Sequence, residues 1–148
     1  MINKKEIKFR AWSKKYNKLG NVEQINFKNK TLIFDFEFYK HIIVDNYYFG
    51  FEEVELMQYT GIKDMNNKEI YEGDIINYYN KLYIVDYLFS GCYLRDPKGG
   101  FIEFSYYDQC CTLVVGNIYE NPNILDKKEW QKWKNKKVLM QTILMIVC

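Results

Sequence analysis

Three acids grouped around a glycine are the side chains best placed to do chemistry in this 148-residue chain: Glu69, Glu72 and Asp74, with Gly73 between the last two. Neighbouring carboxylates can bind a cation or act together as general acid and base. The same residues are also typical of a solvated turn followed by a strand, because Asp often precedes an apolar run. We favour the turn, since the sequence places no further ligands beside these acids.

His41 is the only histidine, so any Ser-His, Cys-His or histidine-rich zinc arrangement must use it. It lies in the strand-like segment Tyr-Lys-His-Ile-Ile-Val without a pattern of partner residues around it, which favours a packed or surface histidine. Phosphate-binding glycine loops, the Gly-x-Ser-x-Gly elbow and the His-Glu-x-x-His motif are absent from the sequence. We therefore predict no catalytic residues, no metal or cofactor site, no cofactor and no enzymatic activity.

The four cysteines, at positions 92, 110, 111 and 148, do not form a Cys-x-x-Cys pair. This spacing favours reduced cytosolic thiols over a disulfide framework. Cys110 and Cys111 would point to opposite faces if they lay on a strand.

Aromatic residues make up 18% of the chain, and three tyrosine doublets stand out: Tyr47-Tyr48, Tyr78-Tyr79 and Tyr106-Tyr107. On a strand, one residue of each doublet would face the core and the other would face outward. Outward tyrosines can stack on nucleic acid bases or anchor a protein partner. The plainer interpretation, which we favour, is strand propensity on the wall of a barrel.

The formal net charge of +2 is distributed unevenly. Residues 126–137 carry six lysines against Asp126 and Glu129, a local charge of +4, so the rest of the chain sums to −2. Trp130 and Trp133 share one helix face, which an apolar stripe continues. Such a face must be buried against the body, a second copy or a partner. The candidate partner-binding residues are Trp130, Trp133, Lys134, Lys137, Met140 and Leu144.

The rest of the chain reads as short strands joined by turn residues. In residues 31–39 the side chains of Leu32, Phe34, Phe36 and Phe38 alternate with polar ones, the clearest half-buried strand of the chain. Turns are predicted at Gly20-Asn21 and Asn80-Lys81, and a helix is predicted to start at Asn121-Pro122. Further strands are expected at 6–12, 22–27, 47–51, 75–79, 82–88, 92–95, 101–106 and 111–115, whereas 52–60 is ambiguous between helix and strand.

Three segments resemble the YopX family of phage and prophage proteins: LMQYTGIKDMNNKEIYEGDII at 56–76, IKFRAW at 7–12 and GNIYENPNIL at 116–125. The resemblance covers residues 6–126. It implies a mostly β fold, an antiparallel pseudo-barrel with a C-terminal capping helix, and a molecular function that is unassigned in the family. We divide the chain into a YopX-like pseudo-barrel domain, 1–126, and a basic and then apolar helical extension, 127–148, where the chain departs from the family.

These observations predict a non-enzymatic phage or prophage accessory protein in the cytoplasm of the bacterial host. We expect no signal peptide, because the first eight residues, Met-Ile-Asn-Lys-Lys-Glu-Ile-Lys, contain no apolar region, and the apolar residues 138–148 are too few to cross a membrane. The protein is expected to be a homo-oligomer that binds a host protein or nucleoprotein, including a host defence component. Two alternatives remain: a small-barrel nucleic-acid-binding protein, and a nucleotide-sequestering protein or enzyme with its site at a subunit interface.

Overall fold

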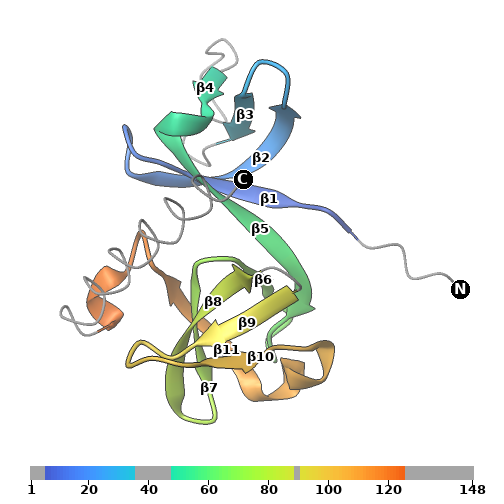
Figure 1. Cartoon of the computed structure of the whole chain (residues 1–148), viewed down its shortest axis with the longest axis vertical. Helices are drawn as coiled ribbons and strands as arrows, with labels where there is room; N and C mark the ends of the chain where they lie inside the picture. Colours follow the sequence, from blue (N-terminus) through green and yellow to red (C-terminus); the bar gives the residue numbers. More distant parts are fainter. Residues whose placement is uncertain (1–5, 36–47, 89–90, 126–148) are drawn as a thin grey trace, which may run out of the picture.

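The computed structural model describes residues 6–35, 48–88 and 91–125, and these residues form two antiparallel β-sheets. In the view of Figure 1, strands β1 to β4 of the six-stranded sheet lie in the upper part of the molecule, whereas its edge strand β6 lies in the lower part with the five-stranded sheet. The long strand β5 runs from one part to the other, so it belongs to the region where the two sheets meet.

The six-stranded sheet contains the first half of the described chain. Its order is β4 (Tyr48–Gly50), β3 (Thr31–Asp35), β2 (Lys18–Asn26), β1 (Phe9–Ser13), β5 (Val54–Lys63) and β6 (Glu69–Tyr71). The predicted alternation in β3 is confirmed: Leu32 and Phe34 are buried, and both belong to an apolar cluster with Phe49. Residues 36–39 of the predicted strand lie outside the described residues.

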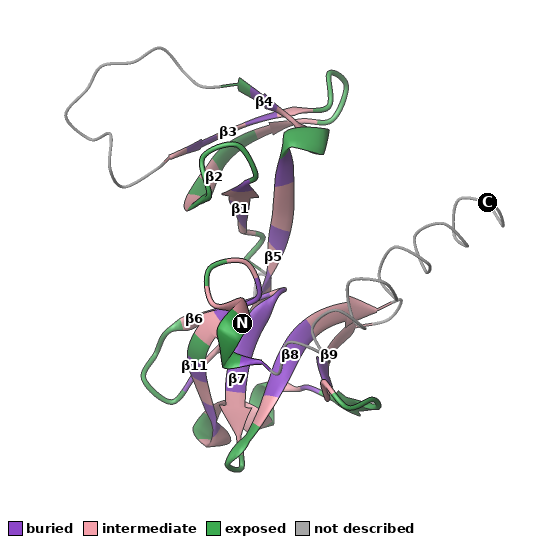
Figure 2. Ribbon diagram, turned by 90° about the vertical axis from the view of Figure 1, so that its left-hand side faces the viewer, coloured by how far each residue is buried: buried purple, intermediate pink, exposed green. Residues whose placement is uncertain are grey.

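The five-stranded sheet contains the second half. Its order is β10 (Phe101–Glu103), β9 (Gly91–Arg95), β8 (Lys81–Leu88), β7 (Asp74–Tyr78) and β11 (Thr112–Asn117). Its central strands are buried on both faces (Figure 2): Ile76 and Val85 lie in one apolar cluster, whereas Ile75 and Ile84 lie in another. Near-continuous apolar runs are typical of strands that are covered on both sides.

The prediction of a mostly β, antiparallel fold is confirmed, and of the predicted pseudo-barrel the described residues show two antiparallel sheets without a closed barrel. Closure requires the outermost strands of a sheet to pair with each other. In the part of the chain that the structure describes, β4 and β6 remain the edges of one sheet, and β10 and β11 remain the edges of the other.

No capping helix is present among the described residues. Only a 3₁₀ turn, η4 (Pro122–Ile124), follows the predicted start at Asn121, and Leu125 after it is extended and buried. Residues 126–148, which carry the rest of the predicted helix, lie outside the described residues. Two further 3₁₀ segments are η2 (Phe51–Glu53) and η3 (Tyr106–Cys111).

Two local predictions are wrong. Gly20 and Asn21 lie inside β2, and the β1–β2 turn falls earlier, where Asn17 has a φ of 50°. A glycine is needed at position 20 because strand β3 passes close to it: an added Cβ would collide with the main-chain oxygen of Asp35. Strand β10 ends at Glu103, and the chain then turns into η3, so Tyr106-Tyr107 and Cys110-Cys111 do not lie on strands.

Candidate functional site

Asp74 begins β7, as predicted, but its side chain is buried, so the prediction of a solvated acid is wrong at this position. Its Oδ1 accepts a hydrogen bond from the Arg10 guanidinium of β1, and its Oδ2 accepts the Tyr71 N–H at 2.8 Å. Arg10 also lies over the Tyr71 ring, 4.5 Å from the ring centroid. Burial raises the pKa of Asp74, and the Arg10 charge and the Tyr71 N–H act in the opposite direction. The ion pair fastens the first strand of one sheet to the start of the other.

Gly73 is the main-chain link between the sheets. Its N–H donates to the Val85 carbonyl at 2.9 Å, and its own carbonyl accepts the Ile118 N–H at 2.9 Å. Its φ is 80°, a region that glycine enters without strain. A Cβ at this position would lie 3.0 Å from the Met57 methyl and 3.3 Å from Ile118. Both the backbone conformation and the packing therefore explain a glycine here.

Asp64 closes the turn between β5 and β6 and joins it to β11. Its Oδ1 accepts the N–H groups of Asn66 and Lys68, each at 2.9 Å, and its Oδ2 accepts the Val114 N–H at 3.0 Å. An aspartate that accepts local main-chain donors is a normal way to build a turn. The side chain is buried with all three donors satisfied, which indicates a structural role.

Glu69 belongs to a second ionic group at the edge strand β6. Its Oε1 accepts the Lys8 ammonium at 2.6 Å and its Oε2 accepts the Tyr71 hydroxyl at 2.7 Å. Burial acts to raise the pKa of Glu69, but these two hydrogen bonds outweigh it and lower the pKa. The hydrogen bond with Glu69, reinforced by Glu6, raises the pKa of Lys8.

Two of the three acids of the motif, Glu69 and Asp74, therefore have different cationic partners, Lys8 and Arg10, and both accept a hydrogen bond from Tyr71. Among the described residues, no group of three or more His, Cys, Asp or Glu side chains is placed to hold a metal ion. Asp74 forms an ion pair with Arg10 of β1, and Glu69 forms one with Lys8, the residue immediately before β1. The geometry of this region is that of a joint between sheets.

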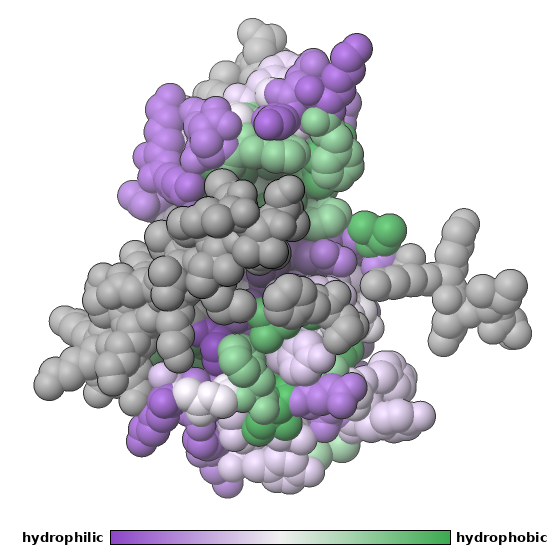
Figure 3. All heavy atoms as spheres, viewed as in Figure 1, coloured by the Kyte–Doolittle hydropathy of each residue, from purple (hydrophilic) through white to green (hydrophobic). Residues whose placement is uncertain are grey.

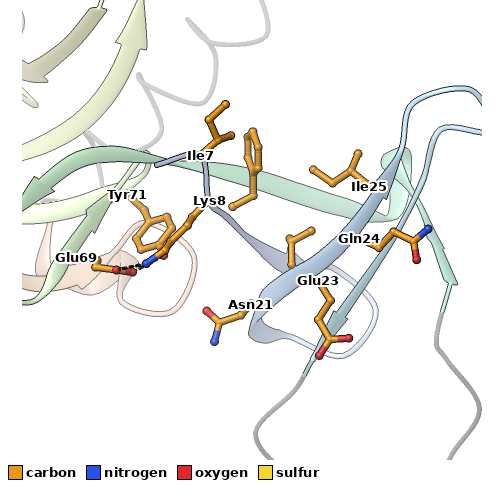
Figure 4. Close-up of a pocket in the computed structure, with 10 residues that line it drawn as sticks. Ile7, Lys8, Asn21, Glu23, Gln24, Ile25, Glu69 and Tyr71 are labelled. Atoms are coloured by element: carbon orange, nitrogen blue, oxygen red, sulfur yellow. Dashed lines mark hydrogen bonds and ion pairs between the residues drawn. The ribbon is translucent and has the colours of Figure 1, made fainter. Parts of the chain in front are cut away.

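A groove of about 500 Å³ lies beside this joint. Figure 4 shows the residues that line it, which come from the start of β1, from β2 and from β6. The Lys8–Glu69 ion pair forms one wall, and Asn21, Glu23 and Gln24 lie along β2 on the other side. The groove combines apolar and polar side chains, as ligand sites do.

A second exposed feature lies at the far end of the five-stranded sheet, and we call it the tyrosine surface: Tyr79, Tyr106 and Tyr107. Their exposed fractions are 71%, 68% and 89%. Two cysteines connect them, because the Cys111 thiol donates to the Tyr79 hydroxyl at 3.2 Å and the Cys110 thiol lies 3.8 Å from the Tyr107 carbonyl. The prediction that one tyrosine of each doublet faces the core and the other faces outward is confirmed for Tyr78-Tyr79, where Tyr78 is half-buried and Tyr79 is exposed. It is wrong for Tyr106-Tyr107, where both side chains are exposed.

Asp108 anchors η3, which carries two of these tyrosines, to strand β7. It accepts the Tyr78 hydroxyl at 2.8 Å and the N–H and hydroxyl of Ser105 at 2.8 and 2.9 Å. Burial acts to raise the pKa of Asp108, but these donors outweigh it and lower the pKa. The hydrogen bond to Asp108 in turn raises the pKa of Tyr78 to about 12.

The described cysteines are free thiols. Cys110 and Cys111 end η3 with their sulfurs 3.4 Å apart, so the two side chains do not point to opposite faces. Burial raises the pKa of Cys92 to about 12, which makes it an inert core thiol at neutral pH.

Several predicted residues fall outside the described residues. They are His41, Tyr47, Cys148 and the candidate partner-binding residues Trp130, Trp133, Lys134, Lys137, Met140 and Leu144. Within the described ranges, no helix combines the length and the apolar character needed to span a bilayer.

Sheet topology and the motif at the joint together define the class of this chain: a two-sheet, mostly antiparallel β-protein whose signature segment holds the sheets together. The sequence matches the family described as YopX protein over residues 8–126, and the chain belongs to that family. A comparison with curated proteins gives no match.

One solved structure with a similar fold is the crystal structure of protein EF1440 from Enterococcus faecalis. It is 23% identical in sequence, with a TM-score of 0.55, and the match covers 83% of this chain and 100% of that chain. At this identity the likeness supports the fold alone.

Sequence reasoning missed Arg10 and Lys8 as partners of the motif acids. Arg10 is 64 residues from Asp74, and no local pattern connects the two. Asp64 did have a local signal, because Asp64-Met65-Asn66-Asn67 is a turn sequence in which the first side chain often accepts main-chain donors.

Proposed function

We propose that this YopX family protein is a non-enzymatic phage or prophage accessory protein of the bacterial cytoplasm. It acts by binding a host protein or nucleoprotein, including a component of host defence. The observation that carries the proposal is the tyrosine surface. Tyrosine supplies a large contact area with little side-chain entropy to lose, and it is enriched among the residues that dominate binding energy.

The backbone at Tyr79 supports the same proposal. Tyr79 and Asn80 form the β7–β8 turn with φ values of 47° and 62°. Asn and Gly suit such positions, whereas a tyrosine is strained there. The Tyr79 ring is nevertheless largely exposed, so core packing does not account for its presence. Strain at an exposed aromatic residue is a reason to assign it a role outside the fold.

The engagement of the motif acids supports a non-enzymatic role. Asp74 is neutralised by Arg10, and Glu69 is held by Lys8 and the Tyr71 hydroxyl. An acid and base pair for catalysis needs groups that can meet a substrate. These carboxylates instead meet other side chains of the joint.

Homo-oligomerisation is part of the proposal and rests on the sequence of the basic and then apolar segment 127–148. If this segment is helical, its apolar stripe would consist of Trp130, Trp133, Met140 and Leu144, accompanied by Lys134 and Lys137. An apolar stripe of this kind requires a second surface to cover it. We propose that another copy of the chain provides that surface.

The test is an affinity purification from a lysate of the host bacterium with the full chain as bait. The bait is compared with a variant that carries Tyr79→Asn, Tyr106→Ser and Tyr107→Ser. The matched control is Tyr48→Ser, which removes a tyrosine of 67% exposure from the other sheet. We expect one or more host proteins to be retained by the unchanged chain and by Tyr48→Ser, and to be lost with the triple variant.

Identical host proteins on all three baits would overturn the role of the tyrosine surface. A parallel purification after nuclease treatment distinguishes the alternative of direct nucleic acid binding. If the chain binds nucleic acid directly, the host proteins are no longer retained on the bait after nuclease treatment. Binding of the purified chain to DNA or RNA then falls steeply as the salt concentration rises.

A further inference from the structure

The strands β1 and β2 diverge, and the groove of about 500 Å³ lies between them. Their ladder runs from the pair Ser13–Lys18 to the pair Arg10–Asn21 and ends there. Strand β2 continues to Asn26 as the partner of β3, with a register shift between Val22 and Gln24. The chain before β1 stays beside β5 instead. A bulge of this kind bends a strand away from its neighbour.

The divergence leaves main-chain groups unpaired. The Lys8 carbonyl accepts the Tyr59 N–H at 2.9 Å, so Lys8 directs its main-chain groups toward β5. Main-chain groups alternate between the two sides of an extended chain, and those of Ile7 therefore point away from β5, toward the groove. Within the described residues, the Ile7 N–H and C=O have no hydrogen-bond partner. Such an edge is a ready template for another strand.

The charged side chains around the groove indicate which kind of ligand it can bind. Glu23 is exposed on the β2 side, and Glu69 lies on the opposite side. The one lysine of the lining, Lys8, is held by Glu69 at 2.6 Å and by Glu6 at 3.0 Å. Acids therefore outnumber cations around the opening. This balance favours a basic occupant and disfavours a nucleotide, whose phosphates the acids would repel.

The apolar residues of the groove indicate an alternating pattern in the occupant. Ile7 is 71% exposed, and Val22 and Ile25 are half-buried in the same lining. Successive side chains of an added strand point to opposite faces, so one set can meet these apolar residues while the other meets Glu23. We propose that the groove binds an extended segment of a partner protein, with alternating basic and apolar side chains, as a short strand added along the start of β1.

The test uses fluorescence anisotropy with the full chain and a fluorescein-labelled hexapeptide of alternating Lys and Val. One control peptide alternates Glu and Val, and a second is the Lys-Val peptide with N-methylated main-chain nitrogens. We expect the Lys-Val peptide to bind and each control peptide to bind at least about tenfold more weakly. The acidic control lacks the charge match, and the N-methylated control lacks the main-chain donors.

Two exposed acids give a matched pair of variants, Glu23→Lys in the groove and Glu103→Lys on β10 of the other sheet. We expect Glu23→Lys to weaken binding of the Lys-Val peptide at least about tenfold and Glu103→Lys to leave it unchanged. Hydrogen exchange should show new protection on peptide binding at residues 6–9 and 22–25.

Equal losses in the two variants would assign the binding to non-specific charge and overturn the proposal. Absence of binding by the Lys-Val peptide, or its displacement by ATP, would also overturn it. The groove is independent of the tyrosine surface, so the variant Tyr79→Asn, Tyr106→Ser, Tyr107→Ser should bind the peptide like the unchanged chain. The two proposals can therefore fail separately.

Discussion

The joint around Gly73 and the tyrosine surface use polar side chains in opposite ways. At the joint, Asp64 and Asp74 are buried and every carboxylate oxygen has a partner in the fold. At the tyrosine surface, Tyr106 and Tyr107 expose most of their rings. Figure 3 shows one face of the molecule, where hydrophilic side chains gather at the top and hydrophobic and near-neutral side chains mix with hydrophilic ones below.

This difference teaches that a recognisable motif need not mark a site of action. The segment 56–76 is distinctive because it makes two turns, one bulge and two inter-sheet attachments within 21 residues. Few residue types satisfy each of these positions. The side chains of Tyr106 and Tyr107 carry no comparable structural demand, because they are mostly exposed, so they are available to a partner.

The largest expected effect is at the joint: Asp74→Ala should lower the free energy of unfolding by about 3–5 kcal/mol. The substitution leaves the Arg10 charge buried without its carboxylate, and removal of one member of a buried pair is strongly destabilising. Urea unfolding followed by tryptophan fluorescence measures the change.

The control for Asp74→Ala replaces both members of the pair, Arg10→Met with Asp74→Leu. Apolar replacement of a buried pair is often close to neutral, so most of the lost stability should return. If Asp74→Ala costs less than about 1 kcal/mol, the pair does not fasten the sheets in the way that the geometry indicates.

Two glycines of the motif separate backbone strain from packing. Gly73 and Gly61 have φ values of 80° and 85°, but only Gly73 has side chains within 4 Å of an added Cβ. Gly61→Ala should therefore cost about 1 kcal/mol through strain alone. Gly73→Ala should cost about 2–3 kcal/mol, because the added methyl also displaces Met57 and Ile118. Thermal and urea unfolding of both variants measure the difference, and equal costs would contradict the role of Gly73 in packing.

Features that depend on local pattern were predictable from the sequence. Alternation identified the buried face of β3, and turn residues identified the β9–β10 hairpin around Asp96–Gly100. The length of β10 was mispredicted because alternation was carried past Glu103. A capping signal was available there: Ser105 and Asp108 have the spacing of a helical N-terminus, and their hydrogen bonds form as that spacing predicts.

Features that depend on distant pairing were not predictable. Alternation shows which side chains of a strand are buried, but it does not show which strands share a sheet, so two open sheets and one barrel have the same local signature. The groove arises where β1 and β2 part, and the register shift between β2 and β3 at this point has no glycine or proline to announce it. The family resemblance gave the correct family over 8–126 and the antiparallel β fold, but it did not show that the described residues divide into two sheets.

At the tyrosine surface we expect a smaller effect of the opposite sign. Tyr79→Asn should raise the free energy of unfolding by about 0.5–1 kcal/mol, because asparagine tolerates the positive φ that strains tyrosine. The loss of packing is small, since the ring is mostly exposed. Urea unfolding of the variant measures the gain, with Tyr106→Ser as a control expected to stay within about 0.5 kcal/mol of the unchanged chain. A loss of stability in Tyr79→Asn would mean that the ring serves the fold.

The smallest expected effect concerns the anchor of the tyrosine surface and depends on pH. The pKa of Asp108 is lower in the folded chain than its ordinary value of 3.8, so its stabilising contribution is complete above about pH 4 and is lost as pH falls through the folded pKa. Asp108→Asn should therefore cost about 0.5 kcal/mol at pH 7, a modest value because the carboxylate is partly exposed, and less at pH 3. Urea unfolding at the two pH values measures the difference between the unchanged chain and the variant. If the difference in free energy of unfolding between the unchanged chain and Asp108→Asn is larger at pH 3 than at pH 7, the Asp108 carboxylate does not act through its charge. The attachment of η3 to Tyr78 would then depend on packing.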